Sequence, residues 1–235
     1  MKKIFVTIIA LLAVSFSLCA QRKAHFSKDV EIGFGNDVFR VEPISYLGYG
    51  YHLWNDDMKQ TQNVFNSEFF VNIMELSLRP ARFMAFNLGV DYDLDTYRLD
   101  KKAAYWTKNE LNDTPIVHPL SMSPYSAVKY SRMRVHTFSI PLSLEFSVGK
   151  CAFRVGAAGE YNLPANIKNR LVAKDGNVKQ SFKGIKTREL TYSAFGAISY
   201  GGLGVYVRYR PVSQFEEGDI QFKSLTIGAA IGLGF

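Results

Sequence analysis

The sequence predicts an all-β fold, specifically an eight-stranded antiparallel transmembrane β-barrel with short periplasmic turns and long extracellular loops. Three observations lead to this prediction. Segments with period-two alternation recur along the chain, short and long connections alternate between them, and the polar faces carry few charges. A soluble sandwich would expose polar faces rich in Lys and Glu. Here those faces hold mainly Gly, Ala, Ser and Thr, which suit the narrow interior of a small barrel.

The first 20 residues resemble a secretory signal peptide and are not expected to belong to the fold. Two lysines near the start precede an apolar run over residues 4–18, and a sequence resembling a cleavage site ends at residue 20. Cys19 would also suit attachment of a lipid, but Leu18 precedes it where a small residue is expected. We therefore expect an exported protein whose barrel domain covers residues 21–235.

Composition limits the remaining classes of function. Residues 21–235 hold 26 basic and 21 acidic side chains, because two of the 28 Lys and Arg lie in the signal. The resulting formal charge of +5 is too mild to indicate nucleic acid binding, and no compact basic motif with interleaved aromatic residues supports it. Cys151 is the one cysteine of this segment, so an internal disulfide is excluded. No apolar run of 18 residues follows the signal, so no transmembrane helix is expected.

Alternation of apolar and polar residues predicts eight strands. They cover residues 28–36, about 66–79, 83–95, 136–148, 151–163, 189–200, 203–210 and 224–235. In the last of them Leu225, Ile227 and Ala229 share one face, while Ser224 and Thr226 lie on the other. Aromatic residues end the apolar faces in two expected girdles, namely Tyr92, Tyr161, Tyr192 and Tyr209 toward the loops and Phe86, Phe146, Phe153, Tyr200 and Phe235 toward the turns.

The connections between these strands alternate in length. Tight turns are expected at Arg79-Pro80-Ala81, Gly149-Lys150 and Gly201-Gly202, and long polar loops at about 37–65, 99–131, 164–187 and 211–220. Short turns at one end, long loops at the other and an even strand count are typical of an outer-membrane barrel. Both termini would then lie on the periplasmic side.

Residues 43–54 allow two interpretations. They alternate as a strand would, with Leu47, Tyr49 and Tyr51 on one face. They could form a hairpin above the membrane in the first loop, or they could be the true first strand, with 28–40 as a periplasmic lead-in. A ninth strand would break the even count, so we favour the loop hairpin.

Charged residues on the inward faces predict ion pairs inside the barrel. A two-residue turn at Gly149-Lys150 pairs Val148 with Cys151, which places Glu145 opposite Arg154 with both side chains inward. The other expected members of this lumen network are Glu160, Arg208, Arg210, Asp91, Asp93 and Asp95. A buried charge must be paired, since an isolated one costs several kcal/mol.

The spacing Asp91-x-Asp93-x-Asp95 also raises the question of a metal site, because carboxylate oxygens suit hard cations. In a strand the outer two residues lie about 13 Å apart, which is too far to share one ion. We therefore expect arginine partners for these carboxylates, and no metal or cofactor.

Six segments stand out in order along the chain: Val30-Glu-Ile-Gly-Phe-Gly, Asn87-Leu-Gly-Val-Asp-Tyr, Tyr97-Arg-Leu-Asp100, Thr137-Phe-Ser-Ile-Pro-Leu-Ser-Leu-Glu-Phe146, Tyr206-Val-Arg-Tyr-Arg-Pro-Val-Ser-Gln-Phe215 and the Gly-rich end at Phe235. Together they resemble the small outer-membrane β-barrel family of Bacteroidota, often called PorT-like. The resemblance implies an eight-stranded barrel resident in the outer membrane. PorT itself is associated with a secretion system for surface proteins. The terminal Phe235 resembles the assembly signal that the barrel assembly machinery reads.

Three function classes remain. We expect a non-enzymatic structural or interaction component of the cell envelope, which contacts outer-membrane lipids, lipopolysaccharide and an envelope protein partner. The alternatives are a small passive pore and a lipid-modifying barrel enzyme, for which His118 with Ser121 or Ser123, and His136 with Ser139, are the nearby pairs. The basic segment 164–187 would suit lipopolysaccharide phosphates, although a solvated mobile loop is the favoured interpretation.

Overall fold

The structure is a computed structural model that describes residues 39–54, 66–81, 83–174, 176–215 and 223–233. This part of the chain is all-β, as predicted. Its elements are β1 (Phe39–Pro43), β2 (Leu47–Trp54), β3 (Ser67–Ala81), β4 (Met84–Arg98), β5 (Ala104–Lys108), β6 (Pro115–Pro119), a 3-10 turn (Leu120–Met122), β7 (Ala127–Val148), β8 (Cys151–Asn162), β9 (Ala165–Ala173), β10 (Gly176–Ile185), β11 (Leu190–Tyr200), β12 (Gly202–Arg210) and β13 (Ser224–Leu233). Within the described residues, no helix has the length and apolar character to cross a membrane. The expected signal peptide, the strand at 28–36 and Phe235 lie outside the described residues.

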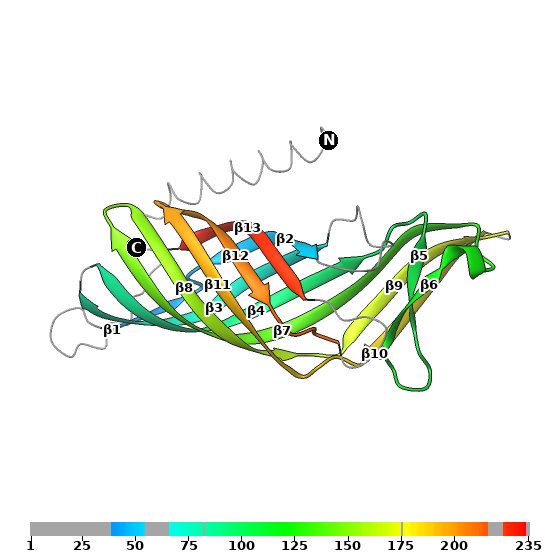
Figure 1. The fold of residues 1–235 in the computed structure, drawn as a ribbon, viewed down its shortest axis with the longest axis horizontal. Helices are drawn as coiled ribbons and strands as arrows, with labels where there is room; N and C mark the ends of the chain where they lie inside the picture. Colours follow the sequence, from blue (N-terminus) through cyan, green and yellow to red (C-terminus); the bar gives the residue numbers. More distant parts are fainter. Residues whose placement is uncertain (1–38, 55–65, 82, 175, 216–222, 234–235) are drawn as a thin grey trace.

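The antiparallel sheet is partly ring-closed (Figure 1). Pairing runs from β2 through β3, β4, β7, β8, β11, β12 and β13, and β13 pairs again with β2. We call this cycle the ring, and it is compatible with a β-barrel. Strand β1 pairs β3, while β9 and β10 extend the sheet beyond the ring.

The preferred interpretation of residues 43–54 was wrong. They do not form a loop hairpin, because β2 (Leu47–Trp54) lies in the ring between β13 and β3. The predicted loop at 37–65 therefore contains both β1 and β2. Ring closure explains the difference, since the free edge of β13 needs a partner and β2 supplies it from Trp54 opposite Ser224 to Leu47 opposite Ile231.

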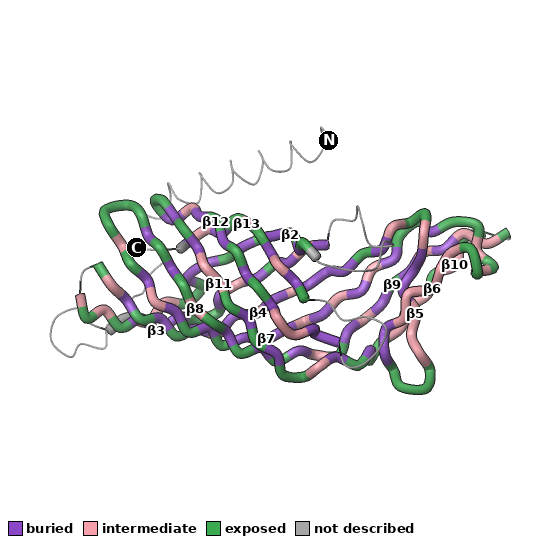
Figure 2. The backbone as a smooth tube through the Cα atoms, in the orientation of Figure 1, coloured by how far each residue is buried: buried purple, intermediate pink, exposed green. Residues whose placement is uncertain are grey.

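Buried and exposed residues alternate along the ring strands (Figure 2). The two faces differ as predicted, with mainly polar or small residues on the buried face and apolar residues on the exposed one. Large apolar side chains exposed on the outside are Leu47, Tyr49, Tyr51, Leu53, Phe69, Phe86, Leu88, Phe138, Ile140, Leu142, Phe146, Phe153, Val155, Tyr161, Leu190, Tyr192, Ile198, Tyr200, Val205, Val207, Tyr209 and Ile227. Ile140 and Leu142 are 60% and 62% exposed. From the short turns up to the level of Leu94 and Phe138, no described outward position of the ring strands carries a charge.

Beyond the ring lies a second folded unit, which we call the distal extension. It consists of β5, β6, β9, β10 and the first part of β7, and it occupies one end of the molecule in Figure 1. Strand β9 pairs residues 127–134 of β7, just beyond the segment that pairs β8. The hairpin β9–β10 thus continues β8 and β11 past a bend at Pro164.

The distal extension corrects two predicted loops. Residues 99–131 include the β5–β6 hairpin, and residues 164–187 form β9 and β10 instead of a mobile loop. These elements enclose an apolar core of their own, which includes Trp106, Met133 and Ile167. The hairpins are ordered because this core covers their inward faces.

Strand β7 runs through both the apolar core of the distal extension and the polar interior of the ring. Toward its start Met133 and Val135 are buried, while Arg132 and Arg134 lie on the outer face. Two residues further on, Thr137 and Ser139 are buried, while Phe138 and Ile140 are exposed. The same side of the strand is buried in both stretches, so the character of the buried face changes from apolar to polar along one continuous element of 22 residues.

Glycines on the inner face of β2 allow the ring to close around large aromatic residues. A Cβ at Gly50 would clash with the Tyr206 hydroxyl and lie 2.8 Å from Cγ2 of Thr226. A Cβ at Gly48 would meet the Phe70 side chain. Closure therefore requires the smallest residue at these positions.

We expect Gly50→Val to destabilise the protein by about 1–3 kcal/mol or more, because the added methyl groups overlap buried atoms. Thermal unfolding of the purified protein in detergent measures this effect. Gly159→Val is the matched control, because a Cβ at Gly159 has nothing within 4 Å. Equal melting temperatures for the two variants would contradict the description of the ring interior.

Candidate functional site

The interior of the ring holds a dense set of charged side chains on neighbouring strands. The buried members are Glu68 and Glu75 from β3, Asp91, Asp93 and Asp95 from β4, Glu145 from β7, Arg154 and Glu160 from β8, and Arg208 and Arg210 from β12. Every residue of the predicted lumen network is therefore buried on the inner side. Glu68 and Glu75 were not predicted.

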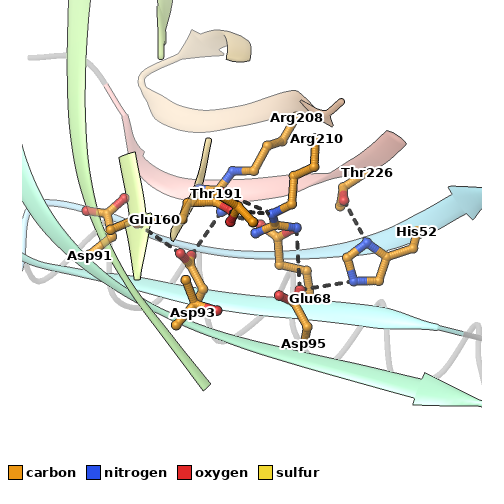
Figure 3. Close-up of polar contacts among 12 residues, drawn as sticks. His52, Glu68, Asp91, Asp93, Asp95, Glu160, Thr191, Arg208, Arg210 and Thr226 are labelled. Carbon is orange, nitrogen blue, oxygen red and sulfur yellow. Dashed lines mark hydrogen bonds and ion pairs between the residues drawn. The ribbon is translucent and has the colours of Figure 1, made fainter. Parts of the chain in front are cut away.

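One group of these side chains, the upper cluster, lies in the half of the ring nearer the distal extension, as the strand registers place it. Figure 3 shows its polar contacts. Arg210 is its centre: Nη1 lies 2.9 Å from Oε2 of Glu68 and 3.6 Å from Oδ1 of Asp95. Its Nε donates to Glu160 at 3.0 Å. Arg208 bonds to Asp93 at 2.9 Å and to Glu68 at 2.8 Å, so Glu68 bridges the two guanidinium groups.

His52 joins the upper cluster from β2. Its Nε2 lies 3.1 Å from Oδ1 of Asp95, and its Nδ1 lies 2.8 Å from the hydroxyl of Thr226. The imidazole is fully buried. Sequence reasoning missed this residue because it assigned the segment to a loop. Only the position of β2 in the ring brings His52 to the carboxylates.

The lower cluster lies toward the short turns and is built around Arg154. Glu145 lies directly opposite Arg154 in the sheet, as the two-residue turn at Gly149-Lys150 predicted. It accepts hydrogen bonds of 2.6 and 3.0 Å from the Arg154 guanidinium group. Glu75 accepts two more, at 2.8 and 2.9 Å, in a bidentate arrangement. One guanidinium thus holds two buried carboxylates.

Aromatic side chains separate the two clusters. Tyr46, Phe70 and Tyr206 form a chain of edge-to-face contacts with centroid distances of 5.8 and 5.0 Å. Arg154 lies over Tyr46 and Arg208 over Phe70, at 5.1 and 5.0 Å from the centroids. Ion pairs and aromatic residues together fill the interior.

Asp91 does not follow the predicted arginine pairing. Its carboxylate accepts a hydrogen bond of 2.6 Å from the Asn72 amide and one of 3.2 Å from the Tyr46 hydroxyl. Both donors are neutral. Asp93 and Asp95 do contact arginines, so the three aspartates of this segment have two kinds of partner.

A polar cap covers the upper cluster on the side of the distal extension. The Gln214 amide donates to Asp95 at 2.9 Å and to Asn162 at 3.1 Å, and its carbonyl accepts from the Tyr97 hydroxyl. Phe215 packs edge-to-face on Tyr97. The segment after β12 therefore closes the ring interior at the end that faces the distal extension.

The upper cluster also contains a set of atoms with the spacing of a metal site. Ligand atoms of His52, Glu68 and Asp95 lie within 4.8 Å of one another. The guanidinium groups of Arg208 and Arg210 already contact these carboxylates and would repel a cation there. The arrangement is that of an ion-pair network.

Four of the residues weighed for catalysis bond to partners other than each other. His136 contacts the Tyr92 hydroxyl, while the Ser139 hydroxyl donates to Asp93 on the opposite face of β7. His118 approaches the Pro119 carbonyl, and the Ser123 hydroxyl donates to Tyr105. Neither histidine contacts its candidate serine in these interactions.

Comparison with known proteins adds no relative: no protein-family model matches the chain, and no curated protein matches it. Its function is therefore inferred from the fold and from the geometry of the interior.

We expect Arg154→Ala to destabilise the protein by about 3–5 kcal/mol, because Glu75 and Glu145 would stay buried without a counter-charge. Thermal unfolding in detergent measures the loss. Leu225→Ala is the control on the outer face, and it should cost far less. Adding Glu75→Gln and Glu145→Gln to Arg154→Ala should recover part of the stability. Equal losses in Arg154→Ala and Leu225→Ala would rule out the pairing account.

Proposed function

We propose that the chain is an integral outer-membrane protein with an eight-stranded transmembrane β-barrel, formed by the strands of the ring. It acts as a non-enzymatic structural or interaction component of the cell envelope. The observation that carries this proposal is the charge-free apolar outer face of the ring, which water would not tolerate over such an area. Lipid is the solvent that suits it.

The polarity switch on β7 supports a membrane boundary at the level of Tyr92 and His136. On one side of that level apolar residues face outward, and on the other side the outward residues are Arg132 and Arg134. Aromatic side chains lie at both ends of the apolar surface. Tyr92, Phe138 and Tyr161 are cross-strand neighbours near the distal extension, and Phe146 faces Phe153 near the short turns.

The filled interior supports a closed lumen in place of a pore. Eight strands leave room only for side chains, and here the two clusters and the aromatic layer occupy it. We therefore propose that the distal extension is the part of the protein that contacts its partners. It would lie outside the cell, since long connections of such barrels are extracellular. A link to secretion of surface proteins, as for PorT, is an extension of this proposal.

The orientation can be tested with single cysteines in a Cys151→Ser background. Glu110→Cys lies between β5 and β6, and Lys150→Cys lies in the turn between β7 and β8; both positions are exposed. We expect a membrane-impermeant maleimide to label position 110 in intact cells. Position 150 should react only after the outer membrane is permeabilised. Labelling of position 150 in intact cells, or recovery of the protein in the soluble fraction, would refute the proposal.

Conductance tests the closed lumen. We expect the purified protein to insert into planar bilayers without conductance above background, because ion pairs and aromatic residues block the path. A triple variant, Tyr46→Ala, Phe70→Ala and Tyr206→Ala, should raise the conductance if it still folds, since it removes the aromatic layer. Steady channels in the unmodified protein would instead favour the passive pore.

A further inference from the structure

The outer face of the sheet carries a compact group of cations where the ring meets the distal extension, just beyond the apolar surface. We name it the outer cationic patch. Its members are Arg98 of β4, Arg132 and Arg134 of β7, Lys168 and Arg170 of β9, and Lys179 of β10. Arg98 lies opposite Arg132, and Arg132 lies opposite Lys168, so three cations form one row across three strands. Arg170 faces Lys179 in the next row.

This patch lacks counter-charges among the described residues. None of the ion pairs within those residues involves a member of it. The Nε atoms of Arg132, Arg134 and Arg170 are buried and have no hydrogen-bond partner. Partial burial, together with the neighbouring Arg132 and Arg98, lowers the pKa of Arg134. Like charges held together in this way favour the binding of an anion between them.

We propose that the outer cationic patch binds the phosphate groups of a phosphorylated glycolipid, lipopolysaccharide, in the outer leaflet. This inference rests on the proposed function, because the barrel sets the level of the patch relative to the membrane. Arg134 lies two residues beyond His136, about 7 Å along the strand, where lipid headgroups begin. Acyl chains would cover Phe138 and Ile140 directly below it.

The shape of the patch favours a headgroup with more than one phosphate. Guanidinium groups bind phosphate through paired hydrogen bonds, and four of the six members of the patch are arginines. The row from Arg98 to Lys168 spans two strand spacings, about 10 Å. The rows from Arg134 to Arg170 extend about 13 Å along the strands. A single phosphate would leave most of these cations unpaired.

The test compares binding to the full chain in nonionic detergent, measured as Kd by fluorescence titration and as a shift in Tm. The probes are rough lipopolysaccharide, the same lipid after chemical dephosphorylation, phosphatidylglycerol and inorganic phosphate. The variant is Arg98→Gln, Arg132→Gln and Lys168→Gln together. The control, Lys101→Gln, Lys174→Gln and Lys223→Gln, removes the same charge from exposed positions outside the patch.

We expect lipopolysaccharide to bind the unmodified protein and the control within about threefold of each other. The patch variant should bind at least about tenfold more weakly, and dephosphorylation should weaken binding to the unmodified protein to the same degree. Equal weakening in both variants would overturn the site in favour of general charge attraction. Equally tight binding of phosphatidylglycerol or inorganic phosphate would overturn the assignment to a glycolipid.

Failure of this inference is separable from failure of the barrel. The patch variant should still pass the cysteine-labelling test of orientation, because its three positions face outward and lie outside the interior clusters. The unmodified protein could label as predicted and yet bind lipopolysaccharide no more tightly than the patch variant does. That result would refute the lipid site without contradicting the proposed barrel.

Discussion

Each charged group inside the ring must have an ion-pair or hydrogen-bond partner, because packed side chains exclude water from that space. This single requirement links strands that are distant in sequence: Arg210 of β12 joins Glu68 of β3 to Glu160 of β8. A slip of one residue along β12 would turn both arginines outward and leave carboxylates unpaired. The pairing therefore specifies the register of the closed sheet as well as filling it. Among the described residues seven buried carboxylates face three buried guanidinium groups, so neutral donors around Asp91 and the imidazole of His52 complete the interior.

The chain combines two arrangements of polar and apolar side chains, one in the ring and one in the distal extension. Strand β7 continues from one arrangement into the other. In the ring, polar residues face inward and apolar residues face outward; in the distal extension the arrangement is that of an ordinary soluble core. Because β7 belongs to both, the extension is positioned by backbone hydrogen bonds instead of by a flexible linker. The outer cationic patch lies where the two arrangements meet.

Period-two alternation predicted strands that the structure has at 136–148, where they form the later part of β7, at 151–162 and at 224–233. The two-residue turn was sufficient to pair Glu145 with Arg154. The alternation on β7 continues before residue 136, but there the apolar residues lie on the other face of the strand. A pattern that requires apolar residues on the outward face therefore ends the predicted strand at residue 136. Glu68 and Glu75 are seven positions apart, so strict alternation would place them on opposite faces. The bulge between Asn72 and Met74 turns both inward. Contacts such as His52 with Asp95 depend on ring closure, which no local pattern contains.

The continuity of β8 with β9, and of β10 with β11, has a mechanical consequence. These segments form one long hairpin against β7, anchored in the ring and reaching to the tip of the distal extension. Hydrogen bonds between antiparallel strands lie perpendicular to the strand axis. A pull on the tip along that axis would load many of them in shear at once and would not open them one after another. The distal extension would therefore resist a pull along the strand axis more strongly than a pull across it.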